Sequence, residues 1–401
     1  MKNIQEQIKI ISKGVDEIIG LEDLKNKLEK SIKENKPLIV KLGLDPSAPD
    51  IHLGHTVVLR KMKQLQDLGH KVIIIIGDFT GKIGDPTGKS KARKALSTEQ
   101  VLENAKTYEE QILKVLDKEK TDIVFNSSWL SKLSFEEAIK LAATTTVARM
   151  LEREDFKKRY ESQTPISLHE FFYPLMQGFD SVEIEADIEL GGTDQRFNVL
   201  MGRALQKEFN QDPQVTIFMP LLEGLDGKEK MSKSLGNYIG IDEKANVMYE
   251  KAMTIPDELI IKYFELVTDI HPDIIDDIKR NLEENKVNPR DVKMDLAKEI
   301  VSLYHGEEES KKAQNRFKEV FQQGQIPSDI KIVEVLKEEF NLIDELVKNN
   351  LVSSKSEVRR LLTQGGIKVN NERLVDIKEL EINKEMIVQV GKKKFIKLII
   401  K

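Results

Sequence analysis

Short apolar runs alternate with amphipathic stretches along the first half of the chain. The runs "PLIVKLGL" (37–44) and "VIIIIG" (72–77) are almost continuously apolar, as expected of strands buried on both faces of a parallel sheet. Between them, apolar residues recur at helical spacing at Val58, Met62, Leu65 and Leu68. Gly69 then interrupts the pattern. This order predicts a β-α-β unit.

The same pattern continues further along the chain. "DIVFN" (122–126) and "VTIFMPLL" (215–222) are further predicted strands with helical stretches between them, so the fold class expected is α/β with an open, doubly wound parallel sheet. The Gly-x-Gly-x-x-Gly fingerprint is absent, which disfavours a nicotinamide enzyme. From about Ile241 to Phe321 the pattern turns helical and highly charged, which predicts a separate all-α domain.

The end of the chain differs in composition from the rest. "QQGQIPSD" (322–329) has the composition of a linker, and "VSSKSEVRRLLTQGGIKVNNERLVD" after it predicts a capped helix, a glycine turn and short strands. Residues 353–401 hold 12 Lys and Arg against 6 Asp and Glu, although the whole chain carries a net charge of -5. A basic tail on an acidic body indicates a polyanion partner, and a solvated Lys-rich surface is the alternative.

Composition narrows the class of protein. A chain of 401 residues that is 39% hydrophobic can form two or three domains with cores of their own. It has no cysteine, which excludes disulfides, thiolate catalysis and Cys-ligated zinc and is compatible with a reducing compartment. No segment approaches 18 uninterrupted apolar residues, so we expect neither a signal peptide nor a membrane span.

The motif "HLGH" places two of the six histidines at the predicted strand-to-helix junction. His52 and His55 are three residues apart and share one helix face, where free N–H groups of a helix start can meet phosphates. Gly54 between them allows a flat ring to approach the backbone. A metal pair is the rival interpretation, but there is no cysteine and only His70 lies near in sequence. Packed structural histidines are the second alternative.

Two glycine-bounded basic segments could also meet phosphate. "GDPTGKSKAR" (84–93) resembles a P-loop superficially, but its glycines are one residue too close for the Walker pattern, and an ordinary surface turn is the alternative. Lys89 and Arg93 are its candidate phosphate ligands. "LDGKEKMSKSLGN" (225–237) carries Lys228, Lys230 and Lys233, and a mobile loop of this kind can close cations onto a polyphosphate.

Together these segments resemble the class I aminoacyl-tRNA synthetases. "HLGH" matches the family's first signature with Leu for Ile, and "KMSKS" matches the second at all five positions. Within the class, "YPLMQGFD" (173–180), "GGTDQRFN" (191–198) and "GDPTGK" resemble the bacterial tyrosyl-tRNA synthetases. The C-terminal segment resembles the small RNA-binding domain that those enzymes carry. The resemblance covers about residues 36–401.

The resemblance implies a division into domains. A Rossmann-like catalytic domain is expected at 1–223, with an inserted helical, dimerisation segment at about 127–190. The lysine loop and an α-helical anticodon-binding domain follow at 224–323, a linker at 324–336, and a small α+β RNA-binding domain at 337–401. The implied partners are L-tyrosine, ATP with Mg²⁺, and tRNA(Tyr), in a cytoplasmic homodimer.

The resemblance also implies a chemistry in two steps. The tyrosine carboxylate attacks the α-phosphate of ATP and releases pyrophosphate, and tyrosine then moves to the terminal adenosine of tRNA. The substrate supplies its own nucleophile, so acceleration is expected from alignment and from charge placed for the transition state. Losing one phosphate-binding cation should cost about 2–4 kcal/mol of transition-state stabilisation.

The residue roles implied by the resemblance fall into three groups. For ATP, the residues are Ser47, His52, His55, Gly54 against adenine, Gly192, Asp194 and Gln195 beside ribose, Met231 and Ser234, with Lys89, Arg93, Lys230 and Lys233 on the leaving pyrophosphate. For tyrosine, they are Gly43, Asp45 and Thr80, then Asp85, Tyr173 and Gln177 at the ammonium and Asp180 at the phenol hydroxyl. For RNA, they are Arg359, Arg360 and Lys368. No residues are expected to form a metal site.

Two positions depart from the family pattern. Lys41 stands where one branch of the family has tyrosine, and Leu42 where a cysteine touches ribose. The residue that contacts the phenol besides Asp180 is therefore left open. Three other readings share part of the motif set: a tryptophanyl enzyme, an RNA-binding paralogue without catalysis, and a nucleotidyltransferase of the cytidylyl type. The first lacks the basic terminal domain, and the intact lysines argue against the second.

Overall fold

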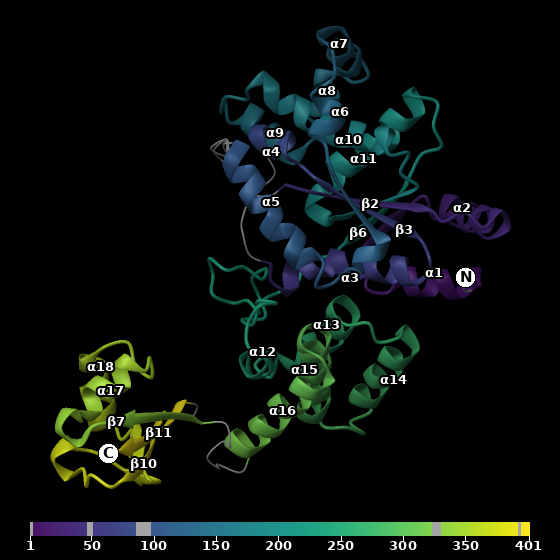
Figure 1. Cartoon of the computed structure of the whole chain (residues 1–401). Helices are drawn as coiled ribbons and strands as arrows, with labels where there is room; N and C mark the ends of the chain where they lie inside the picture. Colours follow the sequence, from purple (N-terminus) through teal and green to yellow (C-terminus); the bar gives the residue numbers. More distant parts are fainter. Residues whose placement is uncertain (1–2, 46–50, 86–97, 323–329, 392–393) are drawn as a thin grey trace. The chain divides into compact units, whose positions relative to one another are not determined.

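The structure is a computed structural model, which describes residues 3–45, 51–85, 98–322, 330–391 and 394–401. The chain divides into two compact units, Met1–Gly306 and Glu307–Lys401 (Figure 1). Within the described residues, no helix is long and apolar enough to cross a membrane.

The first unit is built on a six-stranded sheet in the order β1-β6-β5-β2-β3-β4. The strands are β1 (Glu17–Ile19), β2 (Ile39–Leu44), β3 (Lys71–Ile76), β4 (Thr121–Phe125), β5 (Ile188–Gly192) and β6 (Val215–Met219). All neighbours are parallel except β1, which runs antiparallel to β6. The predicted doubly wound α/β sheet is therefore confirmed. Strand β6 is shorter than the predicted run because Pro220 follows it and has no N–H to continue the ladder.

Helices cover both faces of this sheet (Figure 1). Helix α3, which connects β2 to β3, lies below the sheet in that view, and α10 and α11 lie above it. The helices that precede or connect the strands are α1 (Ile4–Ser12), α2 (Leu21–Glu34), α3 (Leu53–Asp67), α4 (Thr80–Ile83), α5 (Thr98–Ile112) and α11 (Arg196–Glu208). The β4–β5 connection contains α6 (Ser127–Leu130), α7 (Phe135–Ala143), α8 (Val147–Met150), α9 (Glu154–Glu161), the 3₁₀ turn η2 (Leu168–Phe171) and α10 (Phe172–Glu183).

After the lysine loop the chain is helical, as predicted. These are α12 (Ala245–Ala252), α13 (Ile260–Val267), α14 (Pro272–Glu283) and α15 (Pro289–His305). The last two begin with proline at the first turn, where its missing N–H costs nothing. Between 241 and 322, a stretch that is described without a gap, no strand forms.

Polar contacts fix α3 against this helical region. Arg60 Nη1 lies 3.0 Å from Asp269 Oδ2, and Tyr304 OH donates to Thr56 Oγ1 at 3.2 Å. The buried ammonium of Lys61 donates to the carbonyls of Ile10 and Lys13 at 3.0 and 2.7 Å. The helix that begins with the two motif histidines is therefore held from its first turn to its middle, by this helical region and by the end of α1.

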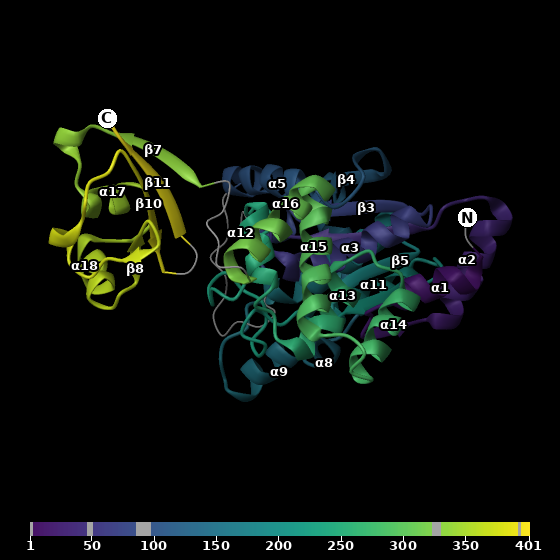
Figure 2. The ribbon, with the colours of Figure 1, turned by 90° about the horizontal axis from the view of Figure 1, so that it is seen from below.

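The second unit has its own sheet and core (Figure 2). Its elements are α16 (Glu307–Phe317), a π-helical turn (Lys318–Gln322), β7 (Lys331–Val335), α17 (Leu342–Lys348), α18 (Lys355–Thr363), β8 (Ile367–Val369), β9 (Glu372–Arg373), β10 (Glu385–Val390) and β11 (Lys394–Ile400). The sheet order is β7-β11-β10-β8-β9. The capped helix and glycine turn are confirmed: Ser354 accepts from Glu357 N, and Gly365 has a φ of +67°.

Strand β7 falls inside the segment 324–336 that the sequence analysis treats as a linker. It pairs in parallel with β11, from Lys331 opposite Ile396 to Val335 opposite Ile400. The folded part of the second sheet therefore begins before residue 337. Only two residues of β7 are even partly buried, so it lacks the apolar run that marks a buried strand.

Separate cores predict separate responses to a core mutation. Leu398 is fully buried among residues of the second unit, so Leu398→Ala should destabilise that unit by about 2–5 kcal/mol. Hydrogen exchange should show lost amide protection in β10 and β11 and unchanged protection in β2 and β3. Ile332→Ala, which truncates an exposed side chain of β7, is the matched control and should change little. Equal loss of protection in both units would contradict the division.

Candidate functional site

The candidate site lies at the carboxyl ends of the parallel strands. The chain order reverses at β2, which pairs with β3 on one side and β5 on the other. Ligands bind in the crevice outside such a switch point. A cavity of about 560 Å³ opens there. Its lining includes the predicted site residues Gly43, Asp45, Gly54, His55, Thr80, Asp85, Tyr173, Gln177, Asp180, Gly192, Asp194, Gln195 and Lys230.

The histidine motif forms the first turn of α3. His52 is the N-cap residue, and its Nδ1 accepts from Gly54 N at 3.1 Å. His52 N in turn donates to His55 Nδ1 at 3.3 Å, and the two rings stack with centroids 3.9 Å apart. Because both Nδ1 atoms accept, the neutral tautomer carries its proton on Nε2 in each ring. The motif therefore offers two N–H donors to an acceptor such as a phosphate oxygen.

Gly54 is required by this arrangement. A Cβ atom there would lie 2.9 Å from His52 Cε1 and 3.0 Å from His52 Nδ1. It would also lie 3.4 Å from Met231 Cβ of the second motif. Any side chain at position 54 would therefore push the capping ring out of place.

Backbone hydrogen bonds join the two motifs. Leu53 N donates to Ile239 O at 2.9 Å, and His52 forms an antiparallel bridge with Gly240. The segment 239–241 directly follows the lysine loop, so the two motifs lie together although about 180 residues separate them in the sequence. The aromatic ring of Tyr238 lies between them, 6.2 Å from the His52 ring and 5.6 Å from Lys233 Nζ.

The lysine loop is organised around one buried asparagine. Asn237 Oδ1 accepts from Ser232 N at 2.8 Å, and Asn237 Nδ2 donates to Asp226 Oδ2 at 2.8 Å. Met231 N donates to Leu222 O, which ties the loop to the end of β6. Lys230 and Lys233 themselves are exposed, and Lys230 lines the cavity. The loop thus presents amines on a hydrogen-bonded backbone.

A chain of hydrogen bonds crosses the strand ends at the bottom of the cavity. Tyr173 OH donates to Asp45 Oδ2, and Thr80 Oγ1 donates to Asp45 Oδ1, each at 2.8 Å. Asn126 Nδ2 reaches both Thr80 Oγ1 at 3.1 Å and Asp180 Oδ2 at 3.3 Å. These side chains are therefore held as one group, although they come from the ends of β2 and β4 and from α4 and α10.

Two close approaches complete this group. Trp129 Nε1 donates to Asp180 Oδ1 at 2.8 Å, so both oxygens of the buried carboxylate have a partner and spare lone pairs remain. Gly77 must be glycine, since a Cβ there would lie 2.0 Å from Asp45 Oδ1 and 2.3 Å from Thr80 Oγ1.

Asp85 is held on the other side of the cavity. Arg153 Nη2 lies 2.8 Å from Asp85 Oδ1, and Gln195 Nε2 donates to Asp85 Oδ2 at 2.9 Å. Asn198 links these two partners, since it accepts from Arg153 and donates to Gln195. Arg153 also pairs with Asp155 at 2.7 Å. Asp85 is thus a fixed carboxylate that can still face a cation in the cavity.

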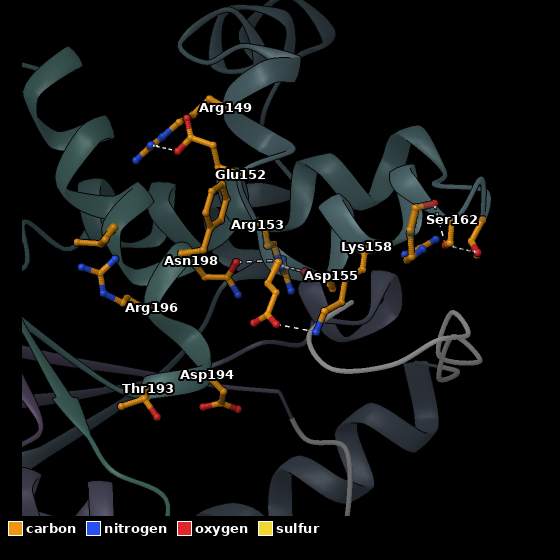
Figure 3. A pocket seen from close by; sticks show the side chains of 15 residues that line it. Arg149, Glu152, Arg153, Asp155, Lys158, Ser162, Thr193, Asp194, Arg196 and Asn198 are labelled. Carbon is orange, nitrogen blue, oxygen red and sulfur yellow. Dashed lines mark hydrogen bonds and ion pairs between the residues drawn. The ribbon is translucent and has the colours of Figure 1, made fainter.

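A larger cavity of about 800 Å³ lies beside α9 and the start of α11 (Figure 3). Its cations are already paired with carboxylates, as with Arg149 and Glu152, and Lys158 and Glu154. Figure 3 shows Arg153 facing Asn198 at its inner wall. We assign the site to the smaller cavity because the strand ends and both motifs converge there, whereas the larger one contains neither motif.

Burial sets the charge state of the polar groups. Desolvation, with smaller effects from His55 and Lys233, lowers the pKa of His52 to about 3, and desolvation and Lys233 lower the pKa of His55. Desolvation raises the pKa of Asp180 to about 7, against the opposing effects of Lys41, Trp129 and Asn126. Desolvation and Asp85 raise the pKa of Asp194. The histidines are therefore neutral donors at neutral pH.

The predicted ATP-binding residues not yet located fall into two sets. Met231, Lys233 and Ser234 belong to the lysine loop next to the cavity. Ser47, Lys89 and Arg93 lie outside the described residues. Across the ranges that the structure covers, no group of three or more His, Asp or Glu side chains is placed to hold a metal ion.

The predicted RNA-binding residues lie in the second unit. Arg359 and Arg360 are exposed on α18, and Lys368 lies on β8 after the glycine turn. Lys368 stands directly opposite Arg373 of β9. Like charges at directly opposed positions destabilise a sheet, so this pair favours a surface made for an anion.

Sequence reasoning missed Asn126, Trp129 and Arg153. Each contacts a predicted residue from more than 40 positions away, and none belongs to a motif. The signal for Asn126 was its place at the end of a predicted strand, at the edge where ligands bind. Trp129 is the chain's one tryptophan, and nothing in the sequence pairs it with Asp180.

Two family models match the chain. Residues 33–322 match the model described as class I tRNA synthetases (W and Y), and residues 321–398 match the tyrosine–tRNA ligase SYY-like C-terminal domain. The chain is 64% identical over 400 residues to tyrosine–tRNA ligase 2 of Clostridium acetobutylicum, covering 100% of both chains. It is 54% identical over 398 residues to the tyrosine–tRNA ligase of Moorella thermoacetica, covering 99% of this chain and 96% of that one.

Solved structures share the fold. A C-terminally truncated mitochondrial tyrosyl-tRNA synthetase from Aspergillus nidulans superposes with a TM-score of 0.65 at 22% identity, covering 80% of this chain and 95% of that one. A tyrosyl-tRNA synthetase from Archaeoglobus fulgidus, complexed with L-tyrosine, superposes with a TM-score of 0.62 at 23% identity, covering 78% and 100%.

The neutral state of the motif histidines is open to measurement. Imidazole ¹H–¹⁵N spectra should show His52 still neutral and protonated on Nε2 at pH 5, because burial opposes its charge. The unfolded chain takes up a proton at this residue below about pH 6.5 and the folded chain does not, so this group makes the fold less stable as the pH falls below that value. The variants His52→Asn and His55→Asn assign the two signals. A titration of His52 centred near pH 6.5 would contradict the placement.

Proposed function

Because this chain belongs to the class I tRNA synthetases that serve tryptophan and tyrosine, and ligates tyrosine to tRNA, we propose which of its residues bind each substrate. Tyrosine lies in the cavity at the strand ends, with its ring between β2 and α10. Its phenol hydroxyl donates to Asp180, and Asn126 is the second polar group at that end. Its ammonium meets Asp85, Tyr173 and Gln177. Gly43, Asp45 and Thr80 complete this part of the site.

One observation carries this assignment. Asp180 is a carboxylate with 3% of its surface exposed that lines the cavity, yet both hydrogen bonds to its oxygens come from neutral groups and none from a cation. The two neutral hydrogen bonds leave spare lone pairs on this buried carboxylate, so a further donor stabilises it. The phenol O–H of tyrosine is such a donor, and phenylalanine offers none.

ATP, entering as its magnesium complex, binds beside tyrosine at the start of α3. Gly54 lies against adenine, and Gly192, Asp194 and Gln195 lie on the ribose side. His52 and His55 donate from Nε2 to the phosphates. Lys230 and Lys233, with Met231 and Ser234 of the same loop, approach from the opposite side. Ser47, Lys89 and Arg93 are assigned to the phosphates from the sequence resemblance alone.

The reaction then needs no group of the protein as nucleophile. A carboxylate oxygen of tyrosine attacks the α-phosphorus, and the bond from that phosphorus to the oxygen bridging to the β-phosphate breaks, which releases pyrophosphate. A ribose hydroxyl of the terminal adenosine next attacks the tyrosyl carbonyl and AMP leaves. The lysines stabilise the charge that develops on pyrophosphate, and the rigid hydrogen-bonded walls align the two reacting groups.

The second unit supplies an RNA-binding surface. Arg359 and Arg360 on α18 and Lys368 on β8 bind phosphates of tRNA(Tyr), and Arg373 opposite Lys368 adds to the same positive surface. Contacts of this kind make affinity fall steeply with salt. Two expectations stay predictions: that the protein acts in the cytoplasm, and that its anticodon-binding region has the limits given above.

We further propose a homodimer formed through the β4–β5 connection. Large apolar side chains are exposed along it, with 83% of Phe135 and 79% of Leu168 accessible, together with Ile139, Val147 and Tyr160. Exposed apolar groups gathered in one segment mark an interaction surface. A second copy of the chain is the partner that fits, since the same surface is then present on both sides of a two-fold interface.

Amino-acid-dependent exchange of pyrophosphate into ATP tests the tyrosine site. The unmodified chain should support exchange with tyrosine and not with tryptophan or phenylalanine. A site built to hydrogen-bond a substrate hydroxyl lowers kcat/KM for the analogue without that hydroxyl by a factor of about 10⁴–10⁵. The upper figure was itself measured on a tyrosyl enzyme, so it is not independent support. Asp180→Asn should lower kcat/KM for tyrosine and reduce the preference over phenylalanine by at least about tenfold.

Asp212→Asn, at an exposed position away from the cavity, is the matched control and should leave the preference intact. Exchange driven by tryptophan, or none with any amino acid, would overturn the substrate assignment. An Asp180→Asn enzyme with an unchanged preference would overturn the role of Asp180 alone.

Light scattering tests the dimer surface. The unmodified chain should elute at twice the chain mass, and Phe135→Glu should shift it to the monomer, because a carboxylate buried in an apolar interface has no partner. Ile274→Glu places the same charge on an exposed apolar position of α14 and should leave the dimer intact. A monomeric parent chain, or equal dissociation by both variants, would refute the proposal.

A further inference from the structure

A lysine without a conventional role lies beneath the tyrosine site. Lys41, in the middle of β2, is completely buried, and its register partner on β5 is Glu189, which is also buried. Lys41 Nζ lies 3.0 Å from Glu189 Oε1. Replacing a buried ion pair with apolar residues of similar size is often neutral or stabilising, so fold stability alone does not account for this pair.

The ammonium of Lys41 binds the helix that carries the tyrosine site. It donates to the backbone carbonyl of Gln177 at 2.9 Å and to Ser181 Oγ at 2.6 Å. Together with the ion pair to Glu189, these two hydrogen bonds give the ammonium polar neighbours on three residues. Gln177 and Ser181 flank Asp180 along α10, so the lysine is attached to the turn that presents Asp180 to the cavity.

Glu189 extends the network to a third element. Its Oε2 accepts from Ser181 Oγ at 3.0 Å and also from Gln214 Nε2, whose side chain contacts the carbonyl of Val199 on α11. Ser181 and Gln214 are fully buried. The pair therefore couples β2, β5, α10 and α11 at a single point under the site.

Lys41 also acts on Asp180 through its positive charge. Desolvation raises the pKa of that carboxyl to about 7, Lys41 is the largest opposing influence, and Glu189 adds to the rise. The other groups packed against Asp180 are the neutral Trp129 and Asn126. On the same helix as Asp180, the Tyr173 hydroxyl donates to Asp45 instead of to Asp180.

We propose that Lys41 is a positioning residue for tyrosine recognition. It fixes α10 against β2, and it supplies the positive charge that keeps Asp180 an acceptor for the phenol hydroxyl. The inference rests on the proposed role of Asp180. It gives a function to the position where one branch of the family has tyrosine: the side chain acts on the substrate through Asp180 and not by touching it.

The test is the pH dependence of tyrosine-driven pyrophosphate exchange between pH 6 and 9. Lys41→Met should lower kcat/KM for tyrosine at pH 7 by about tenfold or more, chiefly through KM. The acidic limb of the pH profile of Lys41→Met should move to higher pH, because loss of the ammonium raises the pKa of Asp180. KM for ATP should change less than twofold. An Asp180→Asn background has no carboxyl to titrate at this position. In it, Lys41→Met should cause little further loss of kcat/KM and should not shift the acidic limb of the pH profile.

Two variants separate positioning from damage to the fold. Lys61→Met removes another completely buried lysine, which binds carbonyls away from the tyrosine end, and should lower thermal stability without moving the tyrosine pH profile. Lys41→Met/Glu189→Leu removes both charges of the pair, so it leaves no unpaired ion and should fold even if the single variant does not. The acidic limb of the pH profile of this double variant should still move to higher pH, but by less than in Lys41→Met.

The outcomes distinguish this inference from the function on which it rests. If Asp180→Asn reduces the preference for tyrosine but both Lys41 variants keep the parent pH profile and KM, the role of Lys41 is refuted and that of Asp180 stands. Equal losses from Lys41→Met with and without Asp180 would also refute it. If Asp180→Asn itself changes nothing, the proposed tyrosine site fails first.

Discussion

The parallel pairing of β2 with both β3 and β5 is the constraint on which the site depends. It brings the carboxyl ends of the strands to one edge and leaves a crevice where the chain order reverses. Asp45, Asn126 and Gly192 all stand directly at or after a strand end. The start of α3 faces the same edge and adds His52 and His55. The convergence of residues distant in sequence is thus a property of the sheet, and the two motifs are then joined by a few backbone bonds.

Burial gives these side chains fixed positions. A polar group in a dry site must have a partner, and the described site residues supply one another's partners from Tyr173 through Asp45, Thr80 and Asn126 to Asp180. Groups held in this way need little rearrangement when charge develops during the reaction. The same burial suppresses charge on the histidines, so in the proposed ATP site the positive charge is assigned to the exposed lysines of the loop.

Much of this fold follows from the apolar pattern. Four strands of the first sheet were predicted within three residues at each end, and helix α3 was predicted between β2 and β3. Strand β1 is only three half-buried residues, and β5 carries Glu189 and ends in two glycines, so neither has a run that marks a buried strand. Glu189 is tolerated there because Lys41 of the adjacent strand pairs with it, which is a tertiary fact. The two histidines and the loop lysines stood out from their spacing, and the other predicted site residues came from the family resemblance. Asn126, Trp129 and Arg153 instead act through contacts that no local pattern records.

In the proposed arrangement, tyrosine lies in the smaller cavity with its hydroxyl at Asp180 and its activated end toward the two motifs. A crystal structure with a non-hydrolysable tyrosyl-adenylate analogue tests this most directly. The phenol oxygen should lie within hydrogen-bond distance of Asp180, and the adenosine should lie over Gly54 between the start of α3 and the lysine loop. A ligand bound in the larger cavity beside α9, or one bound with its phenol away from Asp180, would contradict the account.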